Sequence, residues 1–174
     1  MKISHSFLIL FLILTLAVPN ALAQGTPPFD VDAAAAVLLD YDSGQVLYSK
    51  QGTAERIPAS LVKVMTMFVA LDLIDQGRAS LTDTTRVSEN AWRMTGSQMF
   101  LEVGETVTIE QLLYGIAVVS GNDACVALAE ALAGSAEVYV QWMNKKAKDL
   151  GLNMTFVDVH GLSENNRMTA LDMA

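Results

Sequence analysis

Residues 56–75 read RIPASLVKVMTMFVALDLID, and this segment predicts a helix that lies inside a larger domain. Pro58 fits the first turn of a helix, where its missing N–H costs nothing. From Ala59 to about Gln76 the residues are apolar on nearly every side of a helix, which is typical of a helix surrounded by protein. Gly77 is placed to end it. The rest of the chain must therefore supply elements that cover this helix.

Lys63 is the unusual residue of this helix, and it predicts a chemical role. Between Ile57 and Ile74 the only other charged residue is Asp72. Burial disfavours the ammonium form, so it lowers the pKa of a lysine and makes the amine a candidate general base. Ser60 lies three residues earlier, on the same helix face and roughly 4.5 Å away along the axis. A hydroxyl nucleophile needs an adjacent base, and this spacing provides one without a histidine.

The N-terminal segment has the pattern of a secretory signal peptide. Lys2 precedes an apolar run from Phe7 to Val18, and residues 21–23 read ALA, a small-x-small cleavage site. The run is too short to span a bilayer comfortably, although an uncleaved anchor is the alternative. We therefore expect residues 1–23 to be a signal peptide and residues 24–174 to form one exported domain.

Composition narrows the possible partners. Removal of residues 1–23, which contain one lysine and no acidic residue, would change the net charge from −8 to −9. Such an acidic surface argues against nucleic acid as a partner. Cys125 is the only cysteine and cannot form an internal disulfide, and no Cys/His cluster has metal-ligand spacing. We therefore expect no metal and no cofactor.

The other predicted elements are one hairpin and several helices. Two strands, residues 33–40 and 45–50, flank a turn rich in Asp and Gly. Residues 79–107 are expected to be irregular, with one short strand near 85–87. Capping and apolar patterns predict helices over residues 108–119, 123–133 and 135–150, with another that begins at residue 170. Because two strands alone do not make a stable sheet, we expect residues beyond Ala174 to complete the fold.

Several stretches of the sequence match one enzyme family. They are residues 34–50, RIPASLVK at 56–63, GSQMFL at 96–101, SGNDAC at 120–125 and HGL at 160–162. In these stretches the chain resembles the low-molecular-mass D-Ala-D-Ala carboxypeptidases, which are penicillin-binding proteins of the β-lactamase/transpeptidase superfamily. The resemblance covers about residues 28–174. It implies an α/β fold in which helices pack on an antiparallel sheet beside an all-helical subdomain, incomplete here at the C-terminus.

The second motif of this family is S-x-N, and three triplets fit it. They are Ser88-Glu89-Asn90, Ser120-Gly121-Asn122 and Ser163-Glu164-Asn165. The first and last lie in polar, loop-like stretches and are expected to be turn or cap residues. The middle triplet lies between two apolar helices, which favours it as the catalytic one.

The resemblance implies a role for each of four residues. Ser60 would attack the carbonyl between two D-alanines of a peptidoglycan stem peptide and release the terminal one, with Lys63 as its base. Ser120 would relay protons, and Asn122 would bind the substrate amide and help to hold Lys63. Penicillins and other β-lactam antibiotics would acylate the same serine and leave slowly. The family also implies a place in the periplasm or at the cell-envelope surface, and work in peptidoglycan biosynthesis and cell shape.

The third motif of the family, Lys-Thr-Gly, does not occur in these 174 residues. In the family its strand binds the substrate carboxylate, and its backbone lends one N–H to the oxyanion hole. We expect the motif beyond Ala174, and we expect residues 1–174 alone not to turn over substrate. A C-terminal membrane anchor, common in the family, would also lie there.

Two other functions stay open at this point. A serine β-lactamase of the same fold would need a base for deacylation, and residues 155–168 offer Asp158 and Glu164 without the Glu-x-x-x-Asn spacing of class A enzymes. An exported binding or sensor module would use the fold without catalysis. His160 could position the deacylating water, although a loop histidine bonded to backbone is the simpler interpretation. Cys125 is best explained as a small buried core residue.

Overall fold

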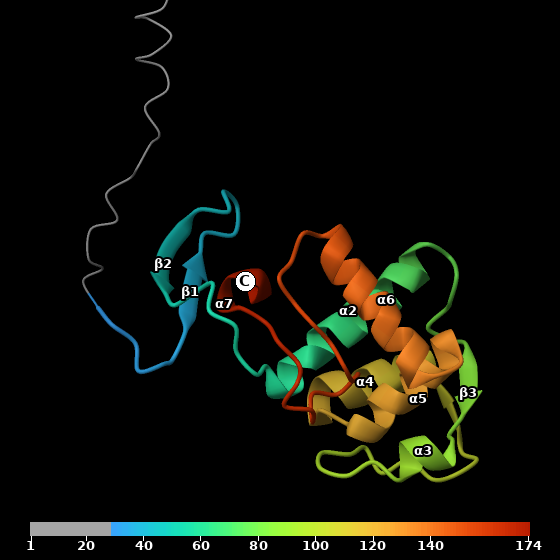
Figure 1. The fold of residues 1–174 in the computed structure, drawn as a ribbon. Coiled ribbons are helices and arrows are strands. Elements are labelled where there is room, and N and C mark those ends of the chain that lie inside the picture. The colour runs from blue at the N-terminus through green and yellow to red at the C-terminus, as the bar shows by residue number, and fades with distance from the viewer. Residues whose placement is uncertain (1–28) are drawn as a thin grey trace, which may run out of the picture. The chain divides into compact units, whose positions relative to one another are not determined.

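The computed structural model describes residues 29–174, and the chain divides into two units, Met1–Asp32 and Ala33–Ala174. The predicted signal peptide, residues 1–23, lies outside the described residues. The second unit is drawn as a coloured ribbon in Figure 1. Within residues 29–174, no helix combines the length and the apolar character needed to cross a membrane.

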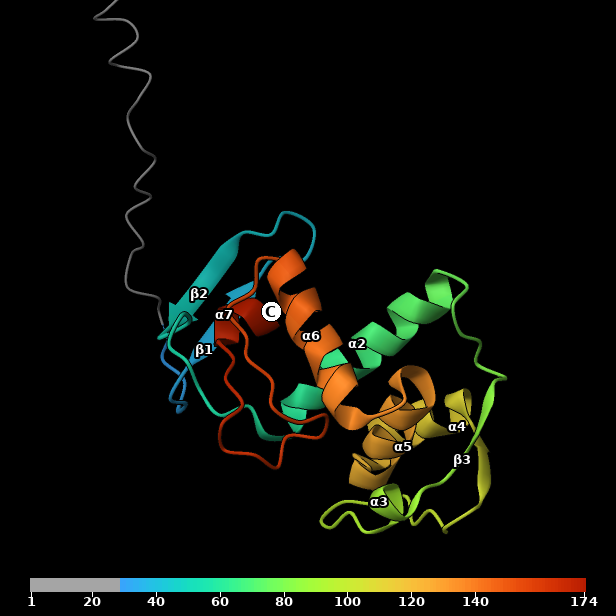
Figure 2. The same ribbon diagram turned by 45° about the vertical axis from the view of Figure 1, so that its right-hand side comes forward.

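The predicted hairpin is confirmed. Strand β1 (Ala36–Leu39) pairs antiparallel with β2 (Val46–Lys50). The turn between them is fixed by Asp40, whose Oδ1 accepts the N–H of Ser43 at 2.9 Å. Gly44 follows with a φ of +68°, a conformation that favours glycine. The short helix α7 (Ala170–Met173) packs against β1, as Figure 2 shows.

The central helix begins and ends as the sequence predicts. A 3₁₀ turn, η1 (Ala59–Leu61), leads into α2 (Val62–Asp75). At its end the N–H of Arg78 donates to the carbonyl of Leu73 at 2.9 Å, while Gly77 takes a φ of +68°. This arrangement satisfies carbonyls that the end of a helix leaves without partners.

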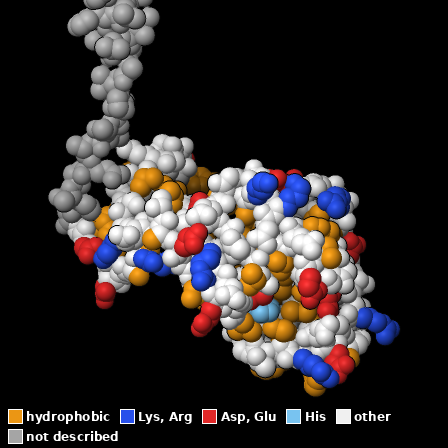
Figure 3. Space-filling view, viewed as in Figure 1, with side chains coloured by type: hydrophobic (Ala, Val, Ile, Leu, Met, Phe, Trp, Pro, Cys, Tyr) orange, Lys and Arg blue, Asp and Glu red, His pale blue; other side chains and the backbone are white. Residues whose placement is uncertain are grey.

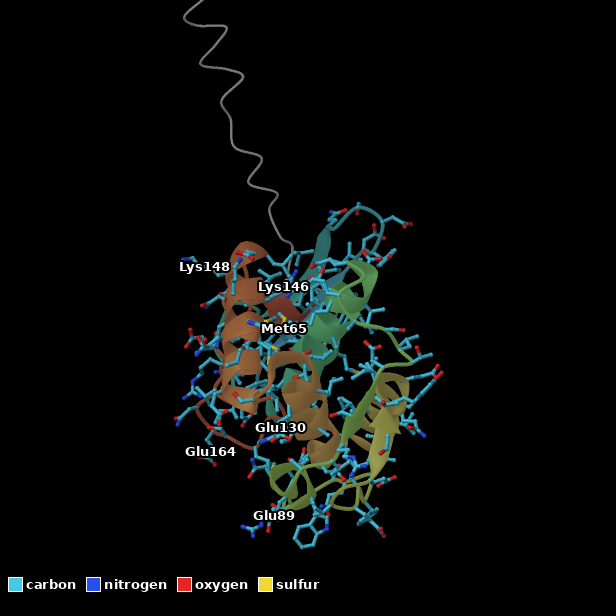
Figure 4. The ribbon with its side chains drawn as sticks, turned by 90° about the vertical axis from the view of Figure 1, so that its right-hand side faces the viewer. Met65, Glu89, Glu130, Lys146, Lys148 and Glu164 are labelled. Carbon is cyan, nitrogen blue, oxygen red and sulfur yellow. The ribbon has the colours of Figure 1, made fainter. Side chains whose placement is uncertain are left out.

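Three further helices pack on α2. They are α4 (Ile109–Val119), α5 (Asn122–Ala133) and α6 (Ala136–Asp149). The predicted capping box of α4 is present, because Thr108 Oγ1 accepts the N–H of Gln111 at 3.1 Å and Gln111 Oε1 accepts the N–H of Thr108 at 2.8 Å. The end of α6 is joined to α2 by an ion pair of 2.5 Å between Lys146 Nζ and Asp72 Oδ2. Figure 4 labels Lys146 on α6 and Met65 on α2.

Residues 79–107 are more regular than predicted. Strand β3 (Thr84–Arg86) pairs antiparallel with β4 (Thr106–Thr108), and α3 (Glu89–Trp92) lies between them in the chain. Strands of three residues are too short for an alternating pattern to stand out, and their pairing joins residues about 20 apart. The three residues of β4 are β-branched and favour a strand, but so short a run does not establish one without its partner.

The expectation that α2 is covered on nearly every side is wrong for one face. Val62, Met65, Val69, Ala70 and Leu73 are buried in the core. The opposite face carries Leu61, Val64, Phe68 and Leu71, which are 43–51% exposed. In the part of the chain that the structure describes, that face is therefore about half exposed. Figure 3 shows a surface on which apolar side chains lie between charges of both signs.

Candidate active site

The structure brings Ser60 and Lys63 together, as the sequence predicts. Ser60 lies in η1 and Lys63 in the first turn of α2. Nζ of Lys63 is 3.1 Å from Oγ of Ser60 and donates to the carbonyl oxygen of His160 at 2.9 Å. The lysine is only 4% exposed. The amine is thus held between the hydroxyl and one backbone acceptor.

The turn that carries Ser60 has a strained backbone. Ala59 has a φ of +48°, which a residue with a Cβ rarely adopts. Strain of this kind persists only where the surroundings hold it, and it gathers at functional sites. Here the surroundings include Gly161, because a Cβ built at that glycine would lie 1.9 Å from the carbonyl oxygen of Ala59. The backbone of the His160-Gly161 loop therefore packs directly on the turn that carries Ser60.

The surroundings lower the pKa of the Lys63 amine. Burial lowers the pKa of Lys63, and the nearby Cys125 and Asp158 oppose part of that effect. Burial also raises the pKa of the Cys125 thiol to about 12. Cys125 is fully buried, which confirms that it is a core residue.

Asp158 organises the loop that faces Lys63. Its Oδ1 accepts the N–H groups of His160 at 3.0 Å and Gly161 at 2.6 Å, and its Oδ2 accepts that of Ser163 at 2.7 Å. The ring of His160 accepts the N–H of Leu162 through Nδ1 at 3.3 Å. The interpretation of His160 as a loop histidine bonded to backbone is thus confirmed. Its carbonyl, rather than its ring, makes the hydrogen bond to Lys63.

A Gly161→Ala substitution tests how tightly this loop packs. Gly161 has a φ of +90°, so alanine would bring left-handed strain of about 1–2 kcal/mol. The clash with the Ala59 carbonyl should add about 1–3 kcal/mol, as overpacking does elsewhere. Gly104→Ala is the matched control, since Gly104 has a φ of +81° and nothing within 4 Å of a built Cβ. Urea unfolding of both variants measures the difference, and equal losses of unfolding free energy would contradict the close packing.

Ser120 lies in the turn between α4 and α5, and Asn122 is the first residue of α5. Ser120 has a φ of +56°, and Asn122 begins α5 with only 3% exposure. The side-chain Nδ2 of Asn122 donates to the carbonyl of Thr95 at 2.7 Å, while its Oδ1 has no hydrogen-bond partner. A buried acceptor without a partner costs about 1–3 kcal/mol, so the hydrogen-bonding capacity of Oδ1 is unused within residues 29–174. In residues 29–174, Lys63 bonds to Ser60 and His160, and no bond joins it to Asn122.

The other two S-x-N triplets have local roles, as expected. Ser88 caps α3 by accepting the N–H of Ala91 at 3.0 Å. Ser163 Oγ accepts the N–H of Asn165 at 3.2 Å. Both hydroxyls therefore serve the backbone beside them, which is the usual behaviour of serine in caps and turns.

Asp123 holds the backbone of residues 99–101 beside the middle triplet. It is fully buried, and its carboxylate accepts the N–H groups of Met99 at 3.0 Å and Leu101 at 3.1 Å. Between them Phe100 takes a φ of +63° and points outward. The buried Asp123 and the partly buried Asp158 thus each hold one backbone segment near the site.

Sequence reasoning missed two functional features of this site. It considered Asp158 only as a possible base for deacylation, and it gave Gly161 no role beyond a family match. A weak signal was present, since Asp158 and Gly161 are turn formers in one loop, and aspartate side chains often accept a backbone N–H two residues further on. The contact of Gly161 with Ala59 joins segments about 100 residues apart and leaves no local pattern.

Comparison with known proteins places the chain in a family. The sequence profile described as D-alanyl-D-alanine carboxypeptidase matches residues 21–174. The D-alanyl-D-alanine carboxypeptidase DacF of Bacillus subtilis is 44% identical over 99% of this chain and 46% of its own length. The solved structure of penicillin binding protein 5 from Haemophilus influenzae has a TM-score of 0.82 at 39% identity, over 86% of this chain and 45% of that one.

An ampicillin-bound penicillin-binding protein from Listeria monocytogenes also has this fold, with a TM-score of 0.74 at 26% identity over 85% of this chain and 61% of that one. These likenesses confirm the predicted fold class. The chain spans about half the length of the curated relatives it matches. It belongs to the D-alanyl-D-alanine carboxypeptidase family.

Proposed function

We propose that the whole protein is a serine-type D-alanyl-D-alanine carboxypeptidase that removes the terminal D-alanine of peptidoglycan stem peptides through an acyl-enzyme on Ser60. One observation carries the proposal. The Ser60 hydroxyl lies 3.1 Å from the amine of Lys63, which is buried in α2 and has a lowered pKa. A neutral amine one helical turn from a hydroxyl can take its proton, which nucleophilic catalysis by serine requires.

The reaction would proceed in two steps. Lys63 accepts the proton of Ser60 as Oγ attacks the carbonyl between the two D-alanines. Collapse of the tetrahedral intermediate breaks the peptide bond, and Ser120 relays the proton to the leaving amine. Asn122 Oδ1, which has no partner within residues 29–174, accepts an N–H of the substrate backbone. Water then attacks the acyl-enzyme and releases the shortened peptide and free Ser60.

Recognition of the substrate carboxylate needs a further part of the protein. Residues 1–174 contain no Lys-Thr-Gly, and they span about half the length of the relatives. Our proposal therefore includes a Lys-Thr-Gly strand outside these residues and assigns turnover to the full-length protein. In the same way, membrane association would depend on a segment outside them.

We also propose an exported location and sensitivity to β-lactams. The signal-peptide pattern of residues 1–23 supports export to the periplasm or the cell-envelope surface, where peptidoglycan is found. The ampicillin-bound relative supports β-lactam binding by this protein, and we assign that binding to Ser60. Both features suit a role in peptidoglycan biosynthesis and cell shape.

Product analysis of the full-length protein tests the function. We expect release of D-alanine from a stem pentapeptide with repeated turnover, and slow hydrolysis of a chromogenic cephalosporin. Rapid cephalosporin hydrolysis without D-alanine release would overturn the proposal in favour of a β-lactamase. The structure gives that alternative little support, because the carboxylate of Asp158 already accepts three backbone N–H groups.

A further inference from the structure

The position of the Lys63 amine depends on a loop far away in the sequence. Within residues 29–174, Nζ has two hydrogen-bond partners, Ser60 Oγ and the carbonyl oxygen of His160. The side chain of lysine is flexible, so a fixed acceptor is needed to hold its amine at one point. The carbonyl of His160 provides that acceptor, and a shift of the loop would move it away from Ser60.

Asp158 is what holds this loop. Its side chain is only 13% exposed, and it accepts N–H groups from His160, Gly161 and Ser163. The three N–H donors lie on both sides of the His160 carbonyl along the chain. Hydrogen bonds to a charged acceptor are stronger than those between neutral groups, so the carboxylate fixes the loop more firmly than an amide would.

The negative charge of Asp158 also acts electrostatically on the amine of Lys63. The groups that face it are Lys63 from α2, Cys125 from α5 and His160 from its own loop. Glu130 of α5, labelled in Figure 4, and Glu137 of α6 line a cavity of about 440 Å³ beside the same loop. Burial raises the pKa of Asp158, but the N–H bonds from the loop and the nearness of His160 outweigh it, so the pKa lies below its ordinary value.

We propose that Asp158 is a positioning residue for acyl transfer, because it holds the loop whose His160 carbonyl fixes the amine of Lys63 beside Ser60. The inference rests on the proposed function and adds to it a residue that touches neither substrate nor nucleophile. The negative charge of Asp158 has a second effect, since it favours the ammonium form of Lys63 and so opposes the effect of burial.

Asp158→Asn in the full-length protein tests both effects at once. We expect the rate of labelling by a fluorescent penicillin to fall by about tenfold or more at its high-pH plateau, since a displacement of about 1 Å can cost roughly a hundredfold. Labelling rises with pH as Lys63 loses its proton. Without the charge of Asp158 the pKa of Lys63 falls further, so this rise should move to lower pH.

Asp123→Asn is the matched control. It also removes one buried carboxylate with backbone N–H donors, but Asp123 is not among the groups that shift the pKa of Lys63. We expect the labelling rate of this variant to rise at the same pH as that of the wild-type protein, whatever rate it reaches at its high-pH plateau. A profile of Asp158→Asn that rises at the wild-type pH, or that moves together with that of Asp123→Asn, overturns the proposal.

Asp158→Glu keeps the inference testable if the asparagine variant does not fold. It retains the charge but lengthens the side chain, so we expect a lower plateau with the rise at the wild-type pH. A full plateau in this variant would show that the three N–H bonds are not needed for positioning. Absence of labelling in the wild-type protein would refute the proposed function itself, whereas normal wild-type labelling without an effect of Asp158 would refute only this inference.

Discussion

Replacement of Ser60 by alanine is expected to abolish covalent labelling by a fluorescent penicillin and the release of D-alanine. Ser60 supplies the only oxygen that the proposed mechanism acylates, and its Oγ is 3.1 Å from the amine of its base. Alanine leaves the methylene of the side chain and removes only the hydroxyl. Intact-protein mass spectrometry should show a β-lactam adduct on the wild-type protein and none on Ser60→Ala.

Ser88→Ala is the control for this experiment. Its hydroxyl caps α3 and serves only the N–H of Ala91, so we expect a loss of about 1 kcal/mol in unfolding free energy and normal labelling. A binding or sensor module would keep its non-covalent affinity for stem peptides in Ser60→Ala and would show no adduct in the wild type. An adduct on Ser60→Ala would place the nucleophile elsewhere.

The sequence predicted the parts of this fold that depend on nearby residues. The hairpin was predicted from Asp42 and Gly44 in its turn, although the structure uses the neighbouring Asp40 for the hydrogen bond. The start of α4 was predicted from Thr108 and Gln111, which are three residues apart. The S-x-x-K pair was found for the same reason, because three residues of helix fix the two side chains on one face. Patterns of this range are what single-sequence reasoning can read.

The remaining parts of the fold depend on contacts between distant residues. Strand β4 exists because it pairs with β3, and its three β-branched residues are too few to establish a strand without that partner. The hydrogen bond from Lys63 to the carbonyl of His160 joins residues 97 apart and involves a backbone atom, which carries no side-chain signature. The exposed face of α2 could not be predicted either, since its apolar side chains look the same whether or not another element covers them.

Lys63→Met is expected to lower the rate of penicillin labelling by about 10²–10⁴-fold, the range that general-base catalysis usually supplies. Methionine has a similar length and no basic group, so it fills the space in α2 without accepting a proton. The wild-type rate should rise with pH through the lowered pKa of Lys63, because only the neutral amine is a base. The residual rate of the variant should lack that rise.

Stability separates this chemical role from a structural one. A lysine whose pKa is lowered by folding binds fewer protons in the native state than in the unfolded chain, so its contribution to stability grows as pH rises from the native pKa to the unfolded one. At pH 7, which lies below the ordinary pKa of lysine, the lowered pKa means that burial of Lys63 costs stability, and Lys63→Met should therefore unfold at no lower urea concentration than the wild type. Lys145→Met, at an exposed lysine of α6, should change neither labelling nor its pH profile. A Lys63→Met protein that is folded and still labelled at the wild-type rate would show that Ser60 finds its base elsewhere.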